Sequence, residues 1–154
     1  MSSDLWSFSL STYALPGVEP LCLRLQSTGA NVCLLLCGAW LGQRGVICTE
    51  PRLQQLQAVA NAWDTDVVQP LRTLRRQWKA ASMTDTELQA LREKVKTLEL
   101  EAERILLLRL EQATQSWPQE GVTDLSVWLE GVTAGAAHLD RDALHKLRVA
   151  VTGT

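Results

Sequence analysis

Basic side chains recur at helical spacing in the middle of the chain. Four of them lie at i, i+3, i+4 and i+7, so in a helix they form one stripe, on the face away from Leu74 and Trp78. Two more follow where we expect the chain to fold back. The six candidate partner-binding residues are Arg72, Arg75, Arg76, Lys79, Arg92 and Lys96. Because guanidinium and ammonium groups bind carboxylates, the stripe favours a docking surface for an acidic protein partner.

Two other interpretations of the same stripe stay open. The cations could bind the phosphates of nucleic acid or of a ribosome, or they could simply be solvated and complement a helix dipole while pairing with Glu87 and Glu93. No aromatic residue is interleaved on the exposed side of the stripe, so the stacking typical of single-strand binders is missing. Glu99, Glu101 and Glu103 follow further along, which predicts a hairpin that is basic toward its turn and acidic toward its base.

The residues that could do enzyme chemistry are few. The chain has two histidines, His138 and His145, and lacks the nucleophile-elbow, P-loop, zinc-protease and dinucleotide motifs. We therefore expect a non-enzymatic protein with no catalytic residues and no cofactor.

All four cysteines lie in the first third of the chain. They contain no C-x-x-C pair, and a structural zinc site built from them is a weaker hypothesis than buried thiols. We therefore predict no metal. The four residues are Cys22, Cys33, Cys37 and Cys48.

Tryptophan makes up most of the aromatic content. Trp6, Trp40 and Trp63 fall on apolar faces of predicted helices, where large aromatic residues usually belong to the core. Since helical bundles also place ligands between helices, these three residues form a candidate pocket for an apolar ligand or an enzyme site.

Two apolar stripes set the architecture that positions these residues. Both step by three and four residues, and a short segment, residues 80–84, separates them, which predicts a long antiparallel helical hairpin. Pro70 should kink or split the first helix. A capping box, Thr84 to Glu87, should start the second, which we expect to reach Ser116. The stripes are Leu53, Leu56, Ala60, Trp63, Val67, Leu74 and Trp78, then Leu88, Leu91, Val95, Leu98, Ala102 and Ile105.

Shorter helices complete an all-α helical bundle. We expect three before the hairpin, over residues 4–13, 18–27 and 32–43, and two after it, over residues 124–137 and 140–151. The first should bury Leu5, Trp6, Leu10 and Tyr13. The third is apolar all round and carries small residues at Gly38 and Gly42 for close helix packing. The chain divides into a helical core, 1–117, and a C-terminal helical pair, 118–154.

Leucines broaden the apolar face of the second long helix near its end. Leu106, Leu107, Leu108 and Leu110 exceed what one neighbour can cover, which predicts a contact with the C-terminal pair or a homodimer.

Several segments of the N-terminal two-thirds of the chain are recognisable, among them Leu5-Trp6-Ser7-Phe8-Ser9-Leu10, Pro16-Gly17-Val18, Gly29-Ala30-Asn31-Val32 and Pro70-Leu71-Arg72. Through these segments this part of the chain resembles a family of short proteobacterial proteins of unknown function. The resemblance implies no catalytic residues. Relatives tend to have Asp-Val-Asn where this chain has Asn31-Val32-Cys33, which implies the loss of an acidic group here.

Composition is that of a globular protein, with 46% hydrophobic and 21% charged residues in 154. The net charge of −2 gives no global attraction to nucleic acid or to an anionic membrane. We see no signal peptide, and the longest apolar stretch, residues 32–41, is about half of the ~20 residues that a bilayer span needs. We therefore expect a cytoplasmic protein without membrane contact.

Overall fold

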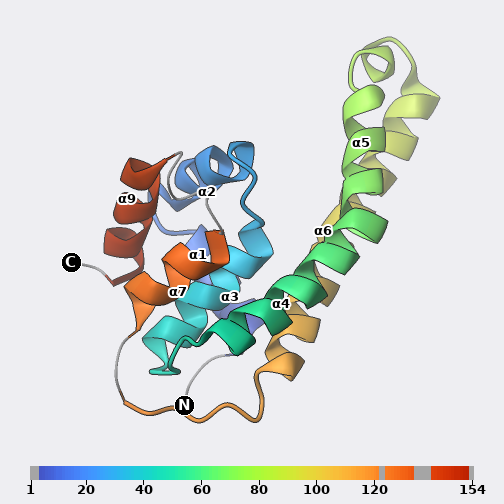
Figure 1. Cartoon of the computed structure of the whole chain (residues 1–154). Helices are drawn as coiled ribbons and strands as arrows, with labels where there is room; N and C mark the ends of the chain where they lie inside the picture. Colours follow the sequence, from blue (N-terminus) through green and yellow to red (C-terminus); the bar gives the residue numbers. More distant parts are fainter. Residues whose placement is uncertain (1–3, 122–123, 134–139, 153–154) are drawn as a thin grey trace.

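The computed structural model of this chain describes residues 4–121, 124–133 and 140–152, and in those residues it contains helices and no strand. The helices form a rounded body from which a two-helix arm projects (Figure 1). This confirms the predicted all-α bundle with a long antiparallel hairpin. The helices are α1 (Leu5–Tyr13), α2 (Val18–Ser27), α3 (Val32–Gln43), α4 (Glu50–Trp63), α5 (Gln69–Gln77), α6 (Thr86–Ala113), α7 (Leu125–Thr133) and α9 (Arg141–Thr152).

Helix α3 is the centre of the body. Asn31 caps it by accepting a hydrogen bond from the backbone N–H of Leu34 at 3.1 Å, and every residue from 33 to 42 is buried. A helix that is apolar on all sides requires neighbours all round, and α1, α2, α4, α6, α7 and α9 supply them.

The two glycines of α3 let α7 pack directly against its backbone. A Cβ at Gly42 would lie 2.6 Å from the Cα of Leu125, and one at Gly38 would lie 3.1 Å from both methyl groups of Val132. The predicted role of these glycines in close internal packing is therefore confirmed.

Helix α1 buries only part of the predicted face, with Trp6 and Tyr13 partly buried against the core. Asp4 caps it, and Leu5 is fully buried as expected, but the other buried residues are Ser9 and Thr12. Leu10 is 54% exposed, so its predicted inward orientation is wrong. The face follows the i, i+4, i+7 positions from Leu5, which apolarity alone does not identify in so short a helix.

The outgoing helix of the hairpin bends where Pro70 was predicted to disturb it. A π-helical turn, Asp64–Val68, separates α4 from α5, and Pro70 lies in the first turn of α5. Proline lacks an N–H and its ring clashes with the carbonyl one turn back, and the wider turn removes both conflicts.

The return helix α6 begins one residue later than the capping box predicts. Asp85 rather than Thr84 is the N-cap, and its carboxylate accepts from the N–H of Leu88 at 3.1 Å. The helix ends at Ala113 instead of Ser116.

The buried seam of the arm is rotated from the predicted stripe of α6. Val95, Glu99 and Ala102 are buried, whereas Leu91 and Leu98 are 50% and 55% exposed. The expectation that these two leucines face the outgoing helix is therefore wrong. The physical reason is the ion-pair network described below, which draws Glu99 into the seam.

The C-terminal helices pack onto the body. α7 lies against α3 and α9 against α2, and Trp128 of α7 is fully buried, its ring N–H donating to the carbonyl of Val46 at 2.6 Å. The predicted division at residues 117 and 118 falls in the segment between α6 and α7 and stays a prediction. Among the described residues, no helix is long and apolar enough to cross a membrane.

Candidate functional site

Two of the predicted docking arginines are engaged inside the arm. Arg72 donates to Glu99 at 3.0 Å and to Glu103 at 3.2 Å, and Arg75 donates to Glu99 at 2.6 Å. The side chains of Arg72 and Glu99 are only 12% and 9% exposed. The acidic partners of Arg72 and Arg75 are thus Glu99 and Glu103 of α6. Of the two acidic residues named in the alternative interpretation of the stripe, Glu93 pairs with Lys96.

The network has opposite effects on its two carboxyl groups. Burial acts to raise the pKa of Glu99, but the hydrogen bonds from Arg75 and Arg72 outweigh it and leave this pKa lowered. For Glu103, burial dominates and raises the pKa, although Arg72 opposes it. Glu99 is therefore stabilised in its charged form by the two arginines. The charge of Glu103 is only partly compensated by Arg72.

The remaining basic residues of the arm are more available. Arg76 and Lys79 are exposed and have no acidic partner among the described residues. Arg92 donates to the backbone carbonyl of Arg75 at 2.9 Å, and Lys96 pairs with Glu93 at 3.2 Å.

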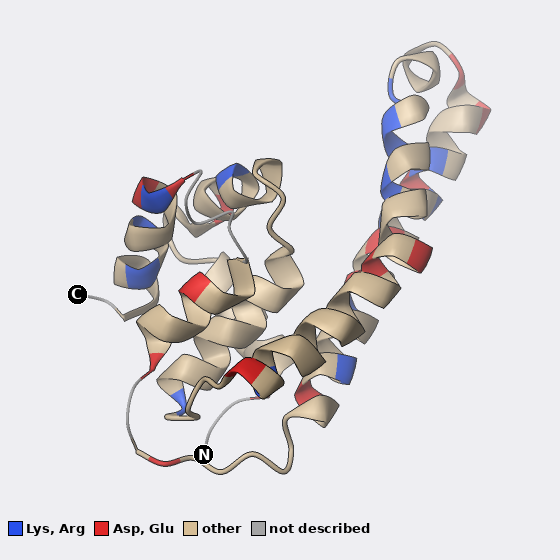
Figure 2. Cartoon of the chain, viewed as in Figure 1, with Lys and Arg blue, Asp and Glu red and all other residues tan. Residues whose placement is uncertain are grey.

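Charge is concentrated at this end of the molecule. Residues 70–96 contain seven Lys and Arg and three Asp and Glu, which gives a net charge of +4 in a chain whose total is −2. Figure 2 shows Lys and Arg along α5, with acidic residues at the tip of the arm and midway down it.

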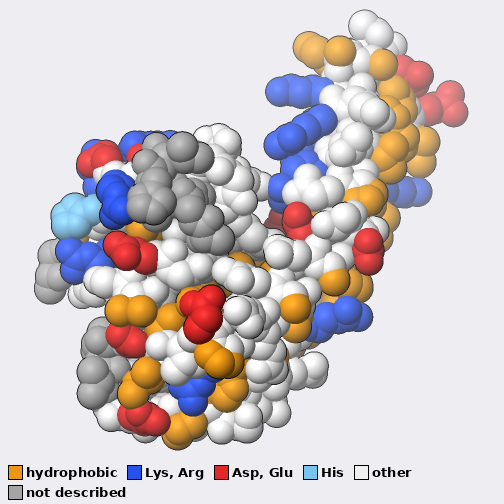
Figure 3. Space-filling model, viewed as in Figure 1, with side chains coloured by type: hydrophobic (Ala, Val, Ile, Leu, Met, Phe, Trp, Pro, Cys, Tyr) orange, Lys and Arg blue, Asp and Glu red, His pale blue; other side chains and the backbone are white. Residues whose placement is uncertain are grey.

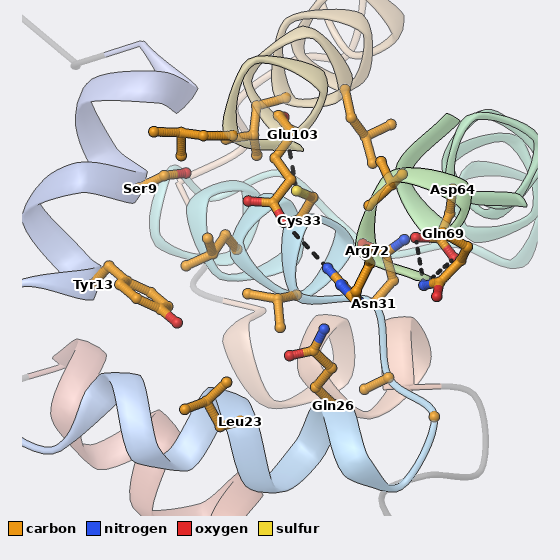
Figure 4. Close-up of a pocket in the computed structure, with 18 of the residues that line it drawn as sticks. Ser9, Tyr13, Leu23, Gln26, Asn31, Cys33, Asp64, Gln69, Arg72 and Glu103 are labelled. Atoms are coloured by element: carbon orange, nitrogen blue, oxygen red, sulfur yellow. Dashed lines mark hydrogen bonds and ion pairs between the residues drawn. The ribbon is translucent and has the colours of Figure 1, made fainter. Parts of the chain in front are cut away.

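A pocket of about 670 Å³ lies where the arm leaves the body. Helices α1, α2 and α3 contribute one side, the π-turn and α5 the other, and α6 closes it (Figure 4). In Figure 3 the basic side chains of α5 face the hollow between arm and body. Arg72 and Arg76 belong to both the basic stripe and this pocket.

The three tryptophans predicted to share a pocket do not meet. Trp6 lines the 670 Å³ pocket, with the guanidinium of Arg104 5.3 Å from its ring centre. Trp40 is buried in the body beneath Arg44, and Trp63 donates to the carbonyl of Ala102 at 2.8 Å while Arg109 covers its ring.

The sequence did not identify Ser9 and Tyr13 as residues of a pocket. Ser9 is 4% exposed, and its hydroxyl is a buried polar group without a hydrogen-bond partner among the described residues. Tyr13 has a pKa raised to about 12, first by burial and then by nearby acidic groups. The only available signal was the position of Ser9 four residues after Leu5, on the same helical face.

The cysteines occupy the core as thiols. Cys22, Cys33 and Cys37 are buried and Cys48 is half-buried, and all four are free. Burial raises the pKa of Cys22 to about 11 and that of Cys33 and Cys37 further, so none of these three is a reactive thiolate at neutral pH.

His145 builds no recognisable site with the other described residues. His145 is exposed and lies 3.2 Å from a guanidinium nitrogen of Arg148, and His138 lies outside the described residues. The described part of the chain contains no cluster of three or more His, Cys, Asp or Glu residues that could hold a metal ion.

Comparison with known proteins places this chain in a family. Residues 4–110 match the family described as "Protein of unknown function (DUF2390)". The chain belongs to this family. No curated protein and no solved structure matches it.

The family match covers the whole candidate site. Every residue that lines the pocket lies between residues 4 and 110, as do all of α5 and α6 as far as Leu110, whereas α7 and α9 lie outside the match. Asn31, where the resemblance implied a lost acidic group, both caps α3 and lines the pocket.

Proposed function

We propose that this protein is a non-enzymatic interaction protein of the bacterial cytoplasm that docks an acidic partner protein on the basic side of its arm. The observation that carries the proposal is the pair Arg76 and Lys79. Both are exposed, neither has an acidic partner among the described residues, and both lie on an arm that stands away from the body (Figure 1). An acidic protein surface would supply the carboxylates that the arm itself lacks there.

Nucleic acid is the weaker alternative for the same residues. Arg72 and Arg75 are committed to Glu99 and Glu103, which leaves few cations for phosphates. The net charge of +4 on residues 70–96 is modest for a surface that relies on backbone contacts.

Charge reversal at the arm tests the proposal. We expect Arg76→Glu/Lys79→Glu to abolish capture of a nuclease-resistant protein partner from native lysate. The control Arg141→Glu/Lys146→Glu makes the same change in net charge on the exposed side of α9 and should capture the partner normally. Capture that nuclease removes would favour nucleic acid, and equal capture by both variants would exclude the basic side of the arm.

A second copy of the chain is a further candidate partner, on the opposite side of the arm. Leu106, Leu107 and Leu110, which suggested a homodimer, are buried in the body, and only Leu108 of that group is exposed. Leu91 and Leu98 are also exposed, and they lie seven residues apart on one face of α6.

The charges beside these leucines favour self-association. Lys94 and Glu101 are exposed, lie seven residues apart, and have no ion-pair partner among the described residues. If two α6 helices pack antiparallel about a twofold axis near Leu98, each Lys94 lies beside Glu101 of the second copy. The face is therefore complementary to itself in both apolar character and charge.

A further inference from the structure

Exposed leucines converge on the pocket between arm and body. Leu10, Leu23 and Leu100 come from three different helices, each has more than half of its surface exposed, at 54%, 51% and 58%, and all three line this one pocket. Isolated exposed leucines are ordinary, but a group that surrounds one concave site is typical of a surface that binds an apolar group.

The interior of the pocket holds a hydroxyl that the protein leaves unsatisfied. Ser9 is 4% exposed, and its Oγ has no hydrogen-bond partner in the part of the chain that the structure describes. In Figure 4 the Ser9 hydroxyl points from α1 toward the space below Glu103 of α6, and Tyr13 points into the same space. A buried hydroxyl without a partner costs stability, so its retention calls for a group that binds it.

The charged residues that line the pocket are balanced in number, with Asp64 and Glu103 opposite Arg72 and Arg76. Glu103 and Arg72 form an ion pair at 3.2 Å, and Arg72 is also held by Glu99 at 3.0 Å. An anionic ligand would meet the carboxylate of Glu103, and a cationic one would meet the guanidinium of Arg72. A neutral polar group that both donates and accepts hydrogen bonds meets neither penalty.

We propose that this pocket binds a small neutral amphiphile with a hydroxyl or primary amide at its polar end. That end bonds to the Ser9 hydroxyl and donates to the Glu103 carboxylate, and the hydrocarbon part lies against Leu10, Leu23 and Leu100. A pocket of about 670 Å³ is of the size that proteins use for small organic ligands.

The chemical class is tested with probes of one chain length. Binding of 1-octanol, octanamide, octanoate and octylamine to the full chain is measured by titration of backbone amide NMR signals. We expect the alcohol and the amide to shift signals of α1, α2 and the middle of α6, and the two charged probes to bind about tenfold more weakly. Equal binding of all four probes, or shifts elsewhere in the chain, would overturn the proposal.

Two variants test the residues. Ser9→Ala removes the unsatisfied hydroxyl, so the free protein should melt at a higher temperature while the affinity for octanol falls about three- to tenfold. Unchanged affinity, or a lower melting temperature, would assign Ser9 a purely structural role and contradict the proposed contact.

Leu23→Ser tests the apolar part of the pocket independently of Ser9. Leu23 is half exposed, so the substitution should leave folding intact and weaken octanol binding about fivefold or more. The control Leu91→Ser changes an equally exposed leucine of the arm outside the pocket and should leave binding unchanged. Neither variant alters Arg76 or Lys79, so loss of ligand binding and loss of partner docking are distinguishable.

Discussion

At the residue scale, Glu99 organises the arm. It accepts hydrogen bonds from both Arg72 and Arg75, and it is 7% exposed although it carries a charge. Because buried charges are tolerated only with good partners, removing the carboxylate leaves Arg75 without an acidic partner among the described residues and leaves Arg72 with Glu103 alone. The basic stripe is therefore divided into two arginines that hold the hairpin together and two cations, Arg76 and Lys79, that remain available.

We expect Glu99→Gln to lower the free energy of unfolding by about 3 kcal/mol at pH 7. The folded-state pKa of Glu99 lies below its ordinary value of 4.5, so its stabilising effect is present above that value and is lost as the pH falls through the folded-state pKa. The difference between wild type and variant should therefore shrink below about pH 4. Urea denaturation across this pH range checks the expectation.

The matched control is Glu93→Gln. Glu93 pairs with Lys96 at 3.2 Å, but both side chains are exposed, at 60% and 43%. Exposed pairs contribute less than about 1 kcal/mol, so this variant should be close to wild type at every pH. A loss as large as that of Glu99→Gln would contradict the special role of the buried network.

At the element scale, α3 joins the family region to the C-terminal helices. Its two glycines face α7, which lies outside the residues that match the family. The two glycines contact α7 differently. A Cβ at Gly42 would meet the backbone of Leu125, whereas a Cβ at Gly38 would meet the side-chain methyl groups of Val132. Backbone cannot move aside without shifting the whole of α7, whereas the methyl groups of Val132 need to shift by only a few tenths of an ångström.

We expect Gly42→Ala to destabilise the protein by about 2 kcal/mol, because overpacking against Leu125 exceeds the gain in helix propensity. Gly38→Ala should be nearly neutral, since that gain of about 1 kcal/mol offsets a mild clash. Thermal unfolding of the two variants side by side checks this order. The reverse order would mean that α7 does not approach α3 as described.

At the scale of the whole molecule, the arm presents two chemically different sides. The basic side faces the hollow beside the body, and side chains of hydrophobic residues gather on the opposite side (Figure 3). No helix among the described residues covers Leu91 and Leu98, so each is about half exposed. A projecting helical hairpin with such a face can complete a four-helix bundle by pairing with a second copy.

We expect this chain to form a dimer in sedimentation-velocity experiments at tens of micromolar. Either single variant, Lys94→Glu or Glu101→Lys, should weaken the dimer about five- to tenfold, because it places like charges opposite each other across the twofold axis. The double variant Lys94→Glu/Glu101→Lys should restore dimerisation, because the exchanged charges again pair. A monomeric wild type, or a double variant no better than either single one, would exclude this interface.

The local sequence alone determined most of the helical elements. Asn31, Thr49 and Asp140 each cap a helix with their own side chain, and Gly29 and Gly45 adopt a positive φ just after a helix end. Pro70 bends the outgoing helix as predicted. These features depend on residues within one or two turns of each other, so spacing along the chain contains all the information that they require.

Only the tertiary structure decided which helix faces pack together and which side chains remain available to bind a partner or a ligand. Arg72 and Glu99 are 27 residues apart, and Ser9 and Glu103 are 94 apart, so no local pattern reveals the ion-pair network or the pocket. The rotation of α6 that exposes Leu91 and Leu98 follows from burying Glu99 against two arginines. A side chain's energy in a folded protein depends on its neighbours in space, and for these residues the neighbours come from distant parts of the chain.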